Sequence, residues 1–263
     1  PNIVFVLFDD IGYGQPKSYR ADSAFKTPNL DHLAKEGMRF TDAHSAAANC
    51  TPTRYGVLTG RYPSRIGQFG VLKTYSAPII PKSRLTVASF LKGRGYHTAC
   101  IGKWHLGDQG EFLPNRHGFD DYFGLPYSND MGIQLLGDAS PSLPARDAID
   151  FDYPPFPPLP LLRDEEVAQE QPDQSALTER YVEEAVRFIR ENGDNPFFLY
   201  FAHMYVHLPL YTPDRFLKES DNGVYGAAVA CIDWAAGVIL HELRQRGLDE
   251  NTLVIFTSDN GSR

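Results

Sequence analysis

Residues 3–10 read IVFVLFDD, six apolar residues followed by two aspartates. An uninterrupted apolar run this short, rich in β-branched side chains, predicts a strand that is covered on both faces, as strands of parallel sheets are. Residues 98–101, 197–201 and 253–257 are similar runs and predict three further strands.

Amphipathic segments separate the predicted strands. The predicted helices cover residues 27–37, 83–92, 175–191 and 228–247. Ser175 is expected to cap the third of them, and Gly37 and Gly247 are expected to end the first and the last. Strands that alternate with helices in this way indicate an α/β fold with a mostly parallel central sheet and helices on both faces.

The composition is that of an ordinary globular protein. The chain has 263 residues, 42% of them hydrophobic and 22% charged, which excludes bulk disorder. A net charge of −8 argues against a nucleic-acid-binding protein, which would carry a basic face. Three cysteines are too few for a disulfide scaffold, and no apolar run approaches 18 residues, so no membrane span is expected.

Residues 141–172 differ from the rest of the chain. They hold 8 of the 20 prolines, together with an acidic patch at residues 164–166. We interpret this stretch as a long surface loop rather than a linker, because neither flank has the elements of a self-sufficient domain. Residues 1–263 are therefore expected to form one domain.

Polar side chains stand where the predicted strands end. In an open α/β sheet the ligand site lies beyond the carboxyl ends of the strands, so these side chains should meet at one rim. Asp9, Asp10, Asp259 and Asn260 would offer oxygen ligands and no thiolate, a set that suits Ca²⁺ or Mg²⁺ better than zinc. Taken alone, an aspartate pair is more often a turn or a helix cap than a metal site.

Lysine and histidine side chains belong to the same rim. Lys103 and His105 follow the second predicted strand and would point the same way if that segment is extended. His203 and His207 follow the third strand at a spacing that could bind zinc on a helix, but Pro209 makes a helix doubtful there. A structural or surface role is the alternative for this pair.

The stretch Cys50-Thr51-Pro52-Thr53-Arg54 is the most distinctive local feature. Pro52 suits the first turn of a helix and Thr51 could cap it, which would put Cys50 at a helix N-terminus. A thiolate and a bound anion are both stabilised at that position, and Arg54 would lie about one turn along. The sequence thus predicts a nucleophile beside an anion site, with a buried structural cysteine as the alternative.

Four motifs, in this order along the chain, resemble those of the sulfatase family. They are residues 9–14 (DDIGYG), residues 50–61 with their Cys-x-Pro-x-Arg and Thr-Gly-Arg parts, residues 102–107 (GKWHLG) and residues 257–261 (TSDNG). Residues 123–130 and 207–209 are also similar to the branch that contains arylsulfatase A and N-acetylgalactosamine-6-sulfatase. The resemblance covers essentially the whole chain and implies an alkaline-phosphatase-like fold and a sulfuric ester hydrolase acting on an aryl sulfate or a sulfated carbohydrate.

The resemblance also implies a chemistry for Cys50. A formylglycine-generating enzyme would oxidise it during maturation, and the hydrate of the resulting formylglycine would be the nucleophile. Ca²⁺, in preference to Mg²⁺, would be bound by residue 50 together with Asp9, Asp10, Asp259 and Asn260.

Further roles follow from the same family motifs. Arg54 and Lys103 would bind the diol and sulfate oxygens, and His105 would accept a proton during sulfate release. His207 would contact the ester and help to protonate the leaving alcohol, and Ser128 would line the substrate side. We favour His207 over His203 because only His207 precedes the Leu-Pro of the family pattern.

One family feature does not occur in this sequence. The family carries a second active-site lysine downstream of the Asp-Asn-Gly motif, as well as a smaller C-terminal subdomain, and we expect the given residues to be part of a longer protein. Two other functions remain open at this stage: a phosphodiesterase or phosphonate monoester hydrolase of the same superfold, and a catalytically silent metal-binding module in which Cys50 stays a thiol. By resemblance the location would be periplasmic, secreted or lysosomal.

Overall fold

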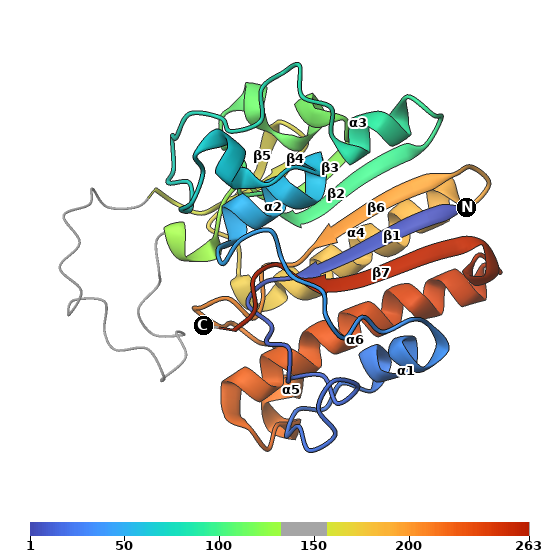
Figure 1. Cartoon of the computed structure of the whole chain (residues 1–263). Coiled ribbons are helices and arrows are strands. Elements are labelled where there is room, and N and C mark those ends of the chain that lie inside the picture. The colour runs from blue at the N-terminus through green and yellow to red at the C-terminus, as the bar shows by residue number, and fades with distance from the viewer. Residues whose placement is uncertain (133–156, 263) are drawn as a thin grey trace, which may run out of the picture.

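The computed structural model describes residues 1–132 and 157–262, and its centre is a seven-stranded sheet (Figure 1). The strand order is β5-β4-β3-β2-β6-β1-β7. The strands are β1 (Asn2–Phe8), β2 (His97–Lys103), β3 (Asp121–Leu125), β4 (Pro160–Arg163), β5 (Glu166–Glu170), β6 (Phe197–Ala202) and β7 (Thr252–Ser258). Five neighbouring strands are mutually parallel, namely β3, β2, β6, β1 and β7, which confirms the mostly parallel α/β sheet. Strand β4 pairs antiparallel with β3, and β5 pairs antiparallel with β4.

Helices cover both faces of the sheet. They are α1 (Pro28–Glu36), α2 (Cys50–Thr59), α3 (Val87–Lys92), α4 (Leu177–Asn192), α5 (Asp214–Glu219) and α6 (Gly223–Gln245). Helices α4 and α6 pack on one face, with α1 against α6, while α2 and α3 lie on the other face (Figure 1). Each face has its own apolar core, since alternate residues of each strand point to opposite sides.

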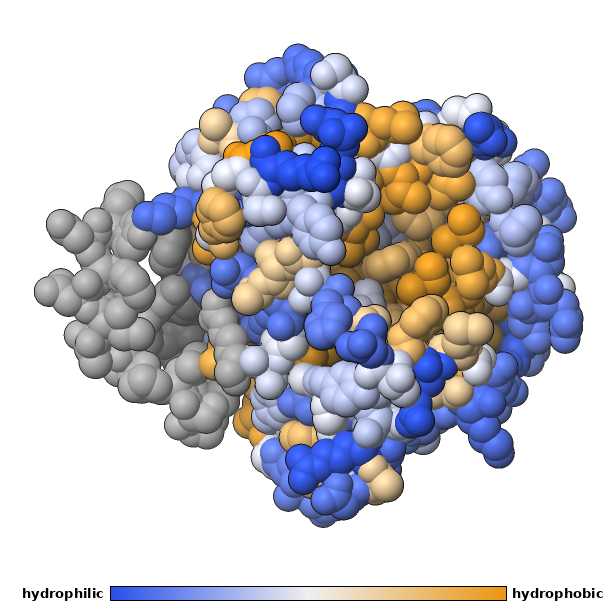
Figure 2. All heavy atoms as spheres, viewed as in Figure 1, coloured by the Kyte–Doolittle hydropathy of each residue, from blue (hydrophilic) through white to orange (hydrophobic). Residues whose placement is uncertain are grey.

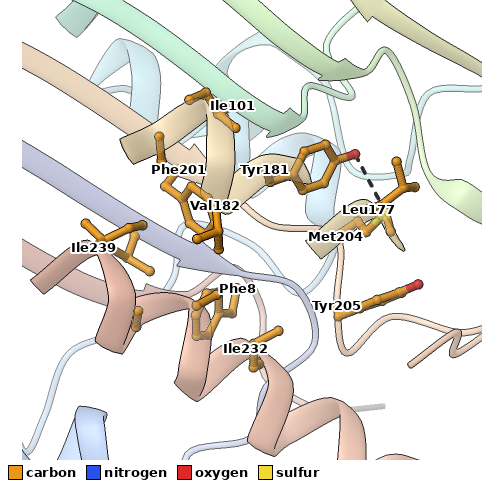
Figure 3. Packing of buried hydrophobic residues seen from close by; sticks show 14 of the residues in the cluster. Phe8, Ile101, Leu177, Tyr181, Val182, Phe201, Met204, Tyr205, Ile232 and Ile239 are labelled. Atoms are coloured by element: carbon orange, nitrogen blue, oxygen red, sulfur yellow. Dashed lines mark hydrogen bonds between the residues drawn. The ribbon is translucent and has the colours of Figure 1, made fainter. Parts of the chain in front are cut away.

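The larger core lies between the sheet and α4 and α6. Figure 3 shows Phe8 and Phe201 of two strands packed against Tyr181 of α4 and Ile232 of α6, and all four side chains are buried. Helix α6 is also long and apolar enough to cross a membrane by length and composition, although no membrane span was expected. Half of its most apolar window is buried inside the protein, where the helix packs against α4 and α1.

The helices leave part of the sheet uncovered. Ile3 and Phe5 of β1 are only half-buried on the face that carries α2 and α3, and Leu253 of β7 is 54% exposed. Figure 2 shows the resulting apolar surface to the right of centre. Strand β7 is also the edge strand on this side.

Three sequence-based expectations about these elements are wrong. The 83–92 helix begins only at Val87, because the hydroxyl of Thr86 accepts from the backbone N–H of Ser89 and caps the helix there. Ser175 is not a cap: it donates to Asp173 in a short 3-10 turn, and the α-helix begins at Leu177.

The proline-rich stretch 141–172 is the third correction. Part of it lies outside the described residues, but β4 and β5 form a hairpin that extends the sheet beyond β3. The surface-loop prediction is therefore wrong for residues 160–170. The prolines do not prevent pairing, since Pro160 is the first residue of its strand. Strand β3, five residues that precede Ser128, was not among the predicted strands.

Two glycines let three strands approach closely below the polar rim. Gly102 of β2 lies between Gly124 of β3 and Ala202 of β6 in the sheet register. A Cβ on Gly102 would stand 2.1 Å from the carbonyl oxygen of Ala202, and its φ of 113° is one that other residues rarely adopt. A Cβ on Gly124 would stand 1.8 Å from the carbonyl oxygen of Gly102. The backbone that leads to Lys103 therefore has no room for a side chain.

Gly102→Ala is expected to lower the free energy of unfolding by about 3 kcal/mol or more, since it combines a backbone clash with an unfavourable φ. Urea unfolding followed by circular dichroism measures the change. Gly110→Ala is the matched control, because a Cβ there meets nothing within 4 Å. Equal stability of the two variants would show that the strands can separate to admit the methyl group.

Candidate active site

The carboxyl ends of β1 and β7 bring together the acidic residues singled out in the sequence. The register pairs Phe8 with Ser258, so Asp9 and Asp259 continue the two strands side by side. The backbone N–H of Asp259 donates to the carbonyl of Phe8 at 3.1 Å, and that of Asp10 donates to Asp259 Oδ1 at 3.1 Å. The prediction that these distant residues meet at one rim is confirmed.

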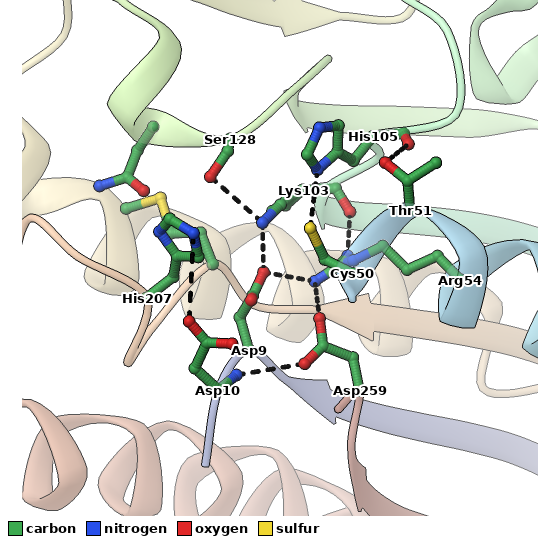
Figure 4. Close-up of polar contacts among 12 residues, drawn as sticks. Asp9, Asp10, Cys50, Thr51, Arg54, Lys103, His105, Ser128, His207 and Asp259 are labelled. Carbon is green, nitrogen blue, oxygen red and sulfur yellow. Dashed lines mark hydrogen bonds and ion pairs between the residues drawn. The ribbon is translucent and has the colours of Figure 1, made fainter. Parts of the chain in front are cut away.

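Asp9 is the electrostatic centre of this rim. Its Oδ2 accepts from Lys103 Nζ at 2.5 Å and from Arg54 Nη2 at 2.9 Å, and all three side chains are fully buried (Figure 4). Burial alone would raise the pKa of Asp9, but the charges of Lys103 and Arg54 outweigh it and lower that pKa. Asp9 is therefore ionised and fixes both cations.

Three carboxylates and one amide form a buried oxygen cluster. Asp9, Asp10 and Asp259 each offer one oxygen, and these atoms lie within 4.8 Å of one another. Asn260 Nδ2 donates to Asp10 Oδ1 at 2.6 Å. Among the described residues, the buried Oδ1 atoms of Asp9 and Asn260 accept no hydrogen bond. Buried acceptors without donors, in an all-oxygen set, fit a hard divalent cation.

Within this cluster, the carboxyl group of Asp259 has a raised pKa. Burial and the neighbouring Asp9 carboxylate raise the pKa of Asp259 to about 7, although Arg54, 3.5 Å away, opposes the shift. A carboxyl pKa raised this far indicates that the site has more negative charge than Arg54 and Lys103 balance.

Cys50 stands at the start of α2, as predicted, but in a different electrostatic state from the one expected. Asn49 occupies the N-cap position, and Thr51 is the second residue of the helix rather than its cap. Burial raises the pKa of the Cys50 thiol despite the nearby Lys103, so the expected stabilisation of a thiolate is wrong for this site. The thiol donates to His105 Nδ1, with an Sγ–Nδ1 distance of 3.2 Å.

The remaining predicted side chains surround the same space. Lys103 Nζ also donates to Ser128 Oγ at 3.2 Å, which joins the loop after β3 to the site. His207 Nδ1 donates to the carbonyl of Leu208 at 2.6 Å, and its Nε2 faces Asp10 Oδ2 at 4.0 Å. Burial and Lys103 lower the pKa of His207, so its neutral form is favoured.

His203 takes no part in this site. Its Nδ1 accepts from the backbone N–H of Tyr205 at 2.9 Å, and its Nε2 donates to Thr178 Oγ1 at 3.0 Å. Both ring nitrogens are thus used inside the core, which is the structural alternative considered for this histidine.

Two groups at the site were not singled out as functional residues in the sequence. The carbonyl of Leu72 lies 3.0 Å from His105 Nε2, and a backbone carbonyl leaves no trace in residue type. Asn129 Nδ2 donates to Gln174 Oε1 at 2.9 Å and to the carbonyl of Pro209 at 3.0 Å. This amide ties the loop that bears Ser128 to the one that bears His207.

The fold is that of sulfatases. The structure of PsFucS1 sulfatase from Pseudoalteromonas sp. superposes with a TM-score of 0.86 at 30% sequence identity, over 98% of this chain and 55% of that chain. The family model described as Sulfatase matches residues 1–263, and the chain belongs to the sulfatase family.

Curated relatives fall in the branch that the motifs indicated. The chain is 40% identical to arylsulfatase A of Homo sapiens over 267 residues, which are 99% of this chain and 52% of the relative. It is 38% identical to N-acetylgalactosamine-6-sulfatase of Rattus norvegicus over 281 residues, which are 100% of this chain and 50% of the relative. The chain therefore spans about half the length of the curated relatives it matches.

The raised pKa of Asp259 predicts a pH-dependent stability in chelator-treated protein. Because the native state holds this proton up to about pH 7 and the unfolded state releases it near pH 3.8, stability falls as the pH rises through that window. Asp259→Asn lacks this titration and keeps an acceptor for the Asp10 N–H. From pH 5 to pH 8 the wild type should lose about 2–3 kcal/mol relative to the variant, as urea unfolding can measure. Parallel pH profiles of the two proteins would contradict the assignment.

Proposed function

We propose that this protein hydrolyses sulfuric esters, with an aryl sulfate or a sulfated carbohydrate as substrate. The observation that carries the proposal is the surroundings of Cys50: His105 contacts its sulfur, and Arg54 and Lys103 project toward the same space from α2 and β2 (Figure 4). Two buried cations beside a reactive position are suited to a tetrahedral anion. The names of the relatives, arylsulfatase A and N-acetylgalactosamine-6-sulfatase, suggest the two substrate classes.

The chemistry needs an oxygen nucleophile at position 50. A buried thiol with a raised pKa is a weak nucleophile, and a sulfur adduct would have no simple way to expel sulfate. We infer that a formylglycine-generating enzyme converts Cys50 to formylglycine, whose hydrate has two hydroxyl groups. One hydroxyl oxygen bonds to sulfur and gives up its proton while the ester S–O bond breaks, and the departing oxygen takes up one proton and leaves as the alcohol. Loss of the second hydroxyl proton then re-forms the aldehyde and breaks the C–O bond to sulfate.

The surrounding residues divide the work of these two steps. Arg54 and Lys103 hold the sulfate oxygens, and preorganised donors of this kind contribute about 10²–10³ in rate each. His105, whose burial and proximity to Lys103 lower its pKa far below normal, is neutral and accepts the hydroxyl proton during sulfate release. His207 is neutral at rest, with its Nδ1 hydrogen bound to the Leu208 carbonyl, so its free Nε2 takes up the proton that the attacking hydroxyl releases and passes it to the leaving alcohol. Ser128 contacts the substrate.

A divalent cation completes the proposed site. Asp9, Asp10, Asp259 and Asn260, with residue 50, would hold Ca²⁺, with Mg²⁺ the less suitable ion for such a carboxylate-rich set. When bound, it would supply positive charge to a site whose three carboxylates exceed its two buried cations by one.

Three wider proposals complete the functional assignment. Residues 1–263 constitute the catalytic N-terminal domain of a sulfatase. Its partners are the maturation enzyme and a small-molecule or carbohydrate sulfate ester, and nucleic acid is not among them. Its place of action is periplasmic, secreted or lysosomal.

Paired substrates test the reaction class. Turnover of an aryl sulfate, a sulfated monosaccharide and the corresponding phosphate and phosphonate esters should favour sulfate by about 10²-fold or more in kcat/KM, if the site is built for the sulfate transition state. A preference for phosphate or phosphonate would support the phosphodiesterase or phosphonate hydrolase alternative instead.

Cys50→Ala is expected to abolish turnover while leaving the fold intact, because it removes the nucleophile and only a small buried side chain. Mass spectrometry of the wild-type peptide that contains residue 50, taken from the native host, should show the aldehyde or its hydrate. An unmodified thiol there would support the silent metal-binding module, and residual activity in the variant would exclude residue 50 as nucleophile.

Asp259→Ala is expected to weaken Ca²⁺ binding by about 10²-fold or more, since it removes one of three clustered carboxylates. Calorimetric titration of chelator-treated protein measures the affinity directly, without an activity assay. Asp249→Ala, at an exposed carboxylate, is the matched control. Equal calcium affinity in the two variants would show that the cluster is not the metal site.

A further inference from the structure

The ring of His105 is held from both sides by groups that decide where its proton sits. Nε2 lies 3.0 Å from the carbonyl oxygen of Leu72, and Nδ1 lies 3.2 Å from Cys50 Sγ. A carbonyl oxygen can only accept, so Nε2 must carry the hydrogen. The neutral ring then presents the lone pair of Nδ1 to residue 50.

The Leu72 carbonyl is itself held in place by a side chain that the proposed mechanism does not use. Thr51 Oγ1 accepts from the backbone N–H of Leu72 at 3.1 Å and donates to the backbone carbonyl of His105 at 3.1 Å. Thr51 is fully buried. One hydroxyl group thus joins the residue that orients the ring to the residue that bears it.

Other side chains anchor the two ends of the segment around Leu72. Leu72 is buried between exposed stretches, and Phe69 and Tyr75 are 69% and 72% exposed. Asn49 Nδ2 donates to the carbonyl of Phe69, and Asp108 accepts from the backbone N–H of Tyr75, so both ends of the segment are fixed. Thr51 holds the middle, where the ring contact is made.

We propose that Thr51 is a positioning residue that keeps the Leu72 carbonyl on His105 Nε2 and thereby keeps the Nδ1 lone pair of His105 directed at residue 50. Its consequence for turnover rests on the proposed function, in which His105 accepts a proton from the hydroxyl group of residue 50. The positioning role of Thr51 does not depend on that function, since the tautomer of His105 is a property of the resting protein.

The tautomer can be measured directly by ¹⁵N NMR of the imidazole nitrogens, on the unconverted Cys50 form of the protein. The His105 signals are assigned by their loss in His105→Asn. In the wild type, His105 should carry its proton on Nε2 in at least about nine molecules of ten, since the alternative tautomer leaves a buried carbonyl facing a lone pair. A wild-type ring protonated on Nδ1 would overturn the proposal without the need for any variant.

Two substitutions and a matched control separate positioning from packing. Thr51→Val removes the hydroxyl at nearly constant volume and should produce a mixture of both tautomers, whereas Thr51→Ser should retain the wild-type spectrum. Thr53→Val removes a hydroxyl of the same kind from the same helix, one that donates to Ala47 instead, and should leave His105 unchanged. A wild-type tautomer ratio in Thr51→Val would overturn the proposal.

Turnover provides the second readout, normalised to the fraction of residue 50 converted to formylglycine in each preparation, as measured by mass spectrometry. Thr51→Val should lower kcat about 10-fold or more and lower KM with it, so that kcat/KM stays within about twofold, because His105 acts only in sulfate release after the ester bond has broken. Thr51→Ser should restore both constants. A raised KM with an unchanged kcat would overturn the positioning role. If no variant or wild type hydrolyses sulfate esters, the proposed function fails, while the NMR result still decides the role of Thr51.

Discussion

The buried carboxylate of Asp9 is the interaction on which the site depends. It joins Lys103 at the end of β2 to Arg54 on α2, and β1 carries it into the space between them. Burying two cations would cost far more than the sheet could offset unless a carboxylate met both, and burying Asp9 alone would be equally unfavourable. The convergence of β1, β2 and α2 is therefore an electrostatic requirement as well as a matter of packing. It also places position 50, one helical turn before Arg54, next to the only histidine that contacts its sulfur among the described residues.

The central strands could be predicted from the sequence because a strand buried on both faces has an almost continuous run of apolar residues. Residues 3–8, 197–201 and 253–257 are almost wholly apolar, and each became a parallel strand of nearly the expected extent. The hairpin of β4 and β5 lacks this signature: every residue of β5 is exposed, and β4 begins with a proline. Its pairing with β3 depends on tertiary context that neither composition nor periodicity records. The start of α3 was misplaced for a related reason, since the hydroxyl of Thr86 competes for the first turn.

Most of the site residues could be predicted from the parallel arrangement of the strands that carry them. Once β1 and β7 are parallel neighbours, Asp9 and Asp259 must lie together, and the same argument brings in Lys103 and His105. The charge state of Cys50 could not be predicted in this way, because the helix N-terminus favours a thiolate while burial of the side chain opposes it more strongly. The role of the Leu72 carbonyl was equally hidden, since every residue type has one.

The paired glycines of β2 and β3 limit how the proposed enzyme could be remodelled by directed evolution. Lys103 and the segment leading to Ser128 are supported by bare backbone at Gly102 and Gly124, where even a methyl group would collide with a carbonyl oxygen of the next strand. Libraries that randomise Gly102 and Gly124 would mainly yield unfolded chains. New substrate preferences are more readily sought in the exposed side chains of Phe69 and Tyr75, which can be replaced while the backbone of this segment keeps the Leu72 carbonyl on His105.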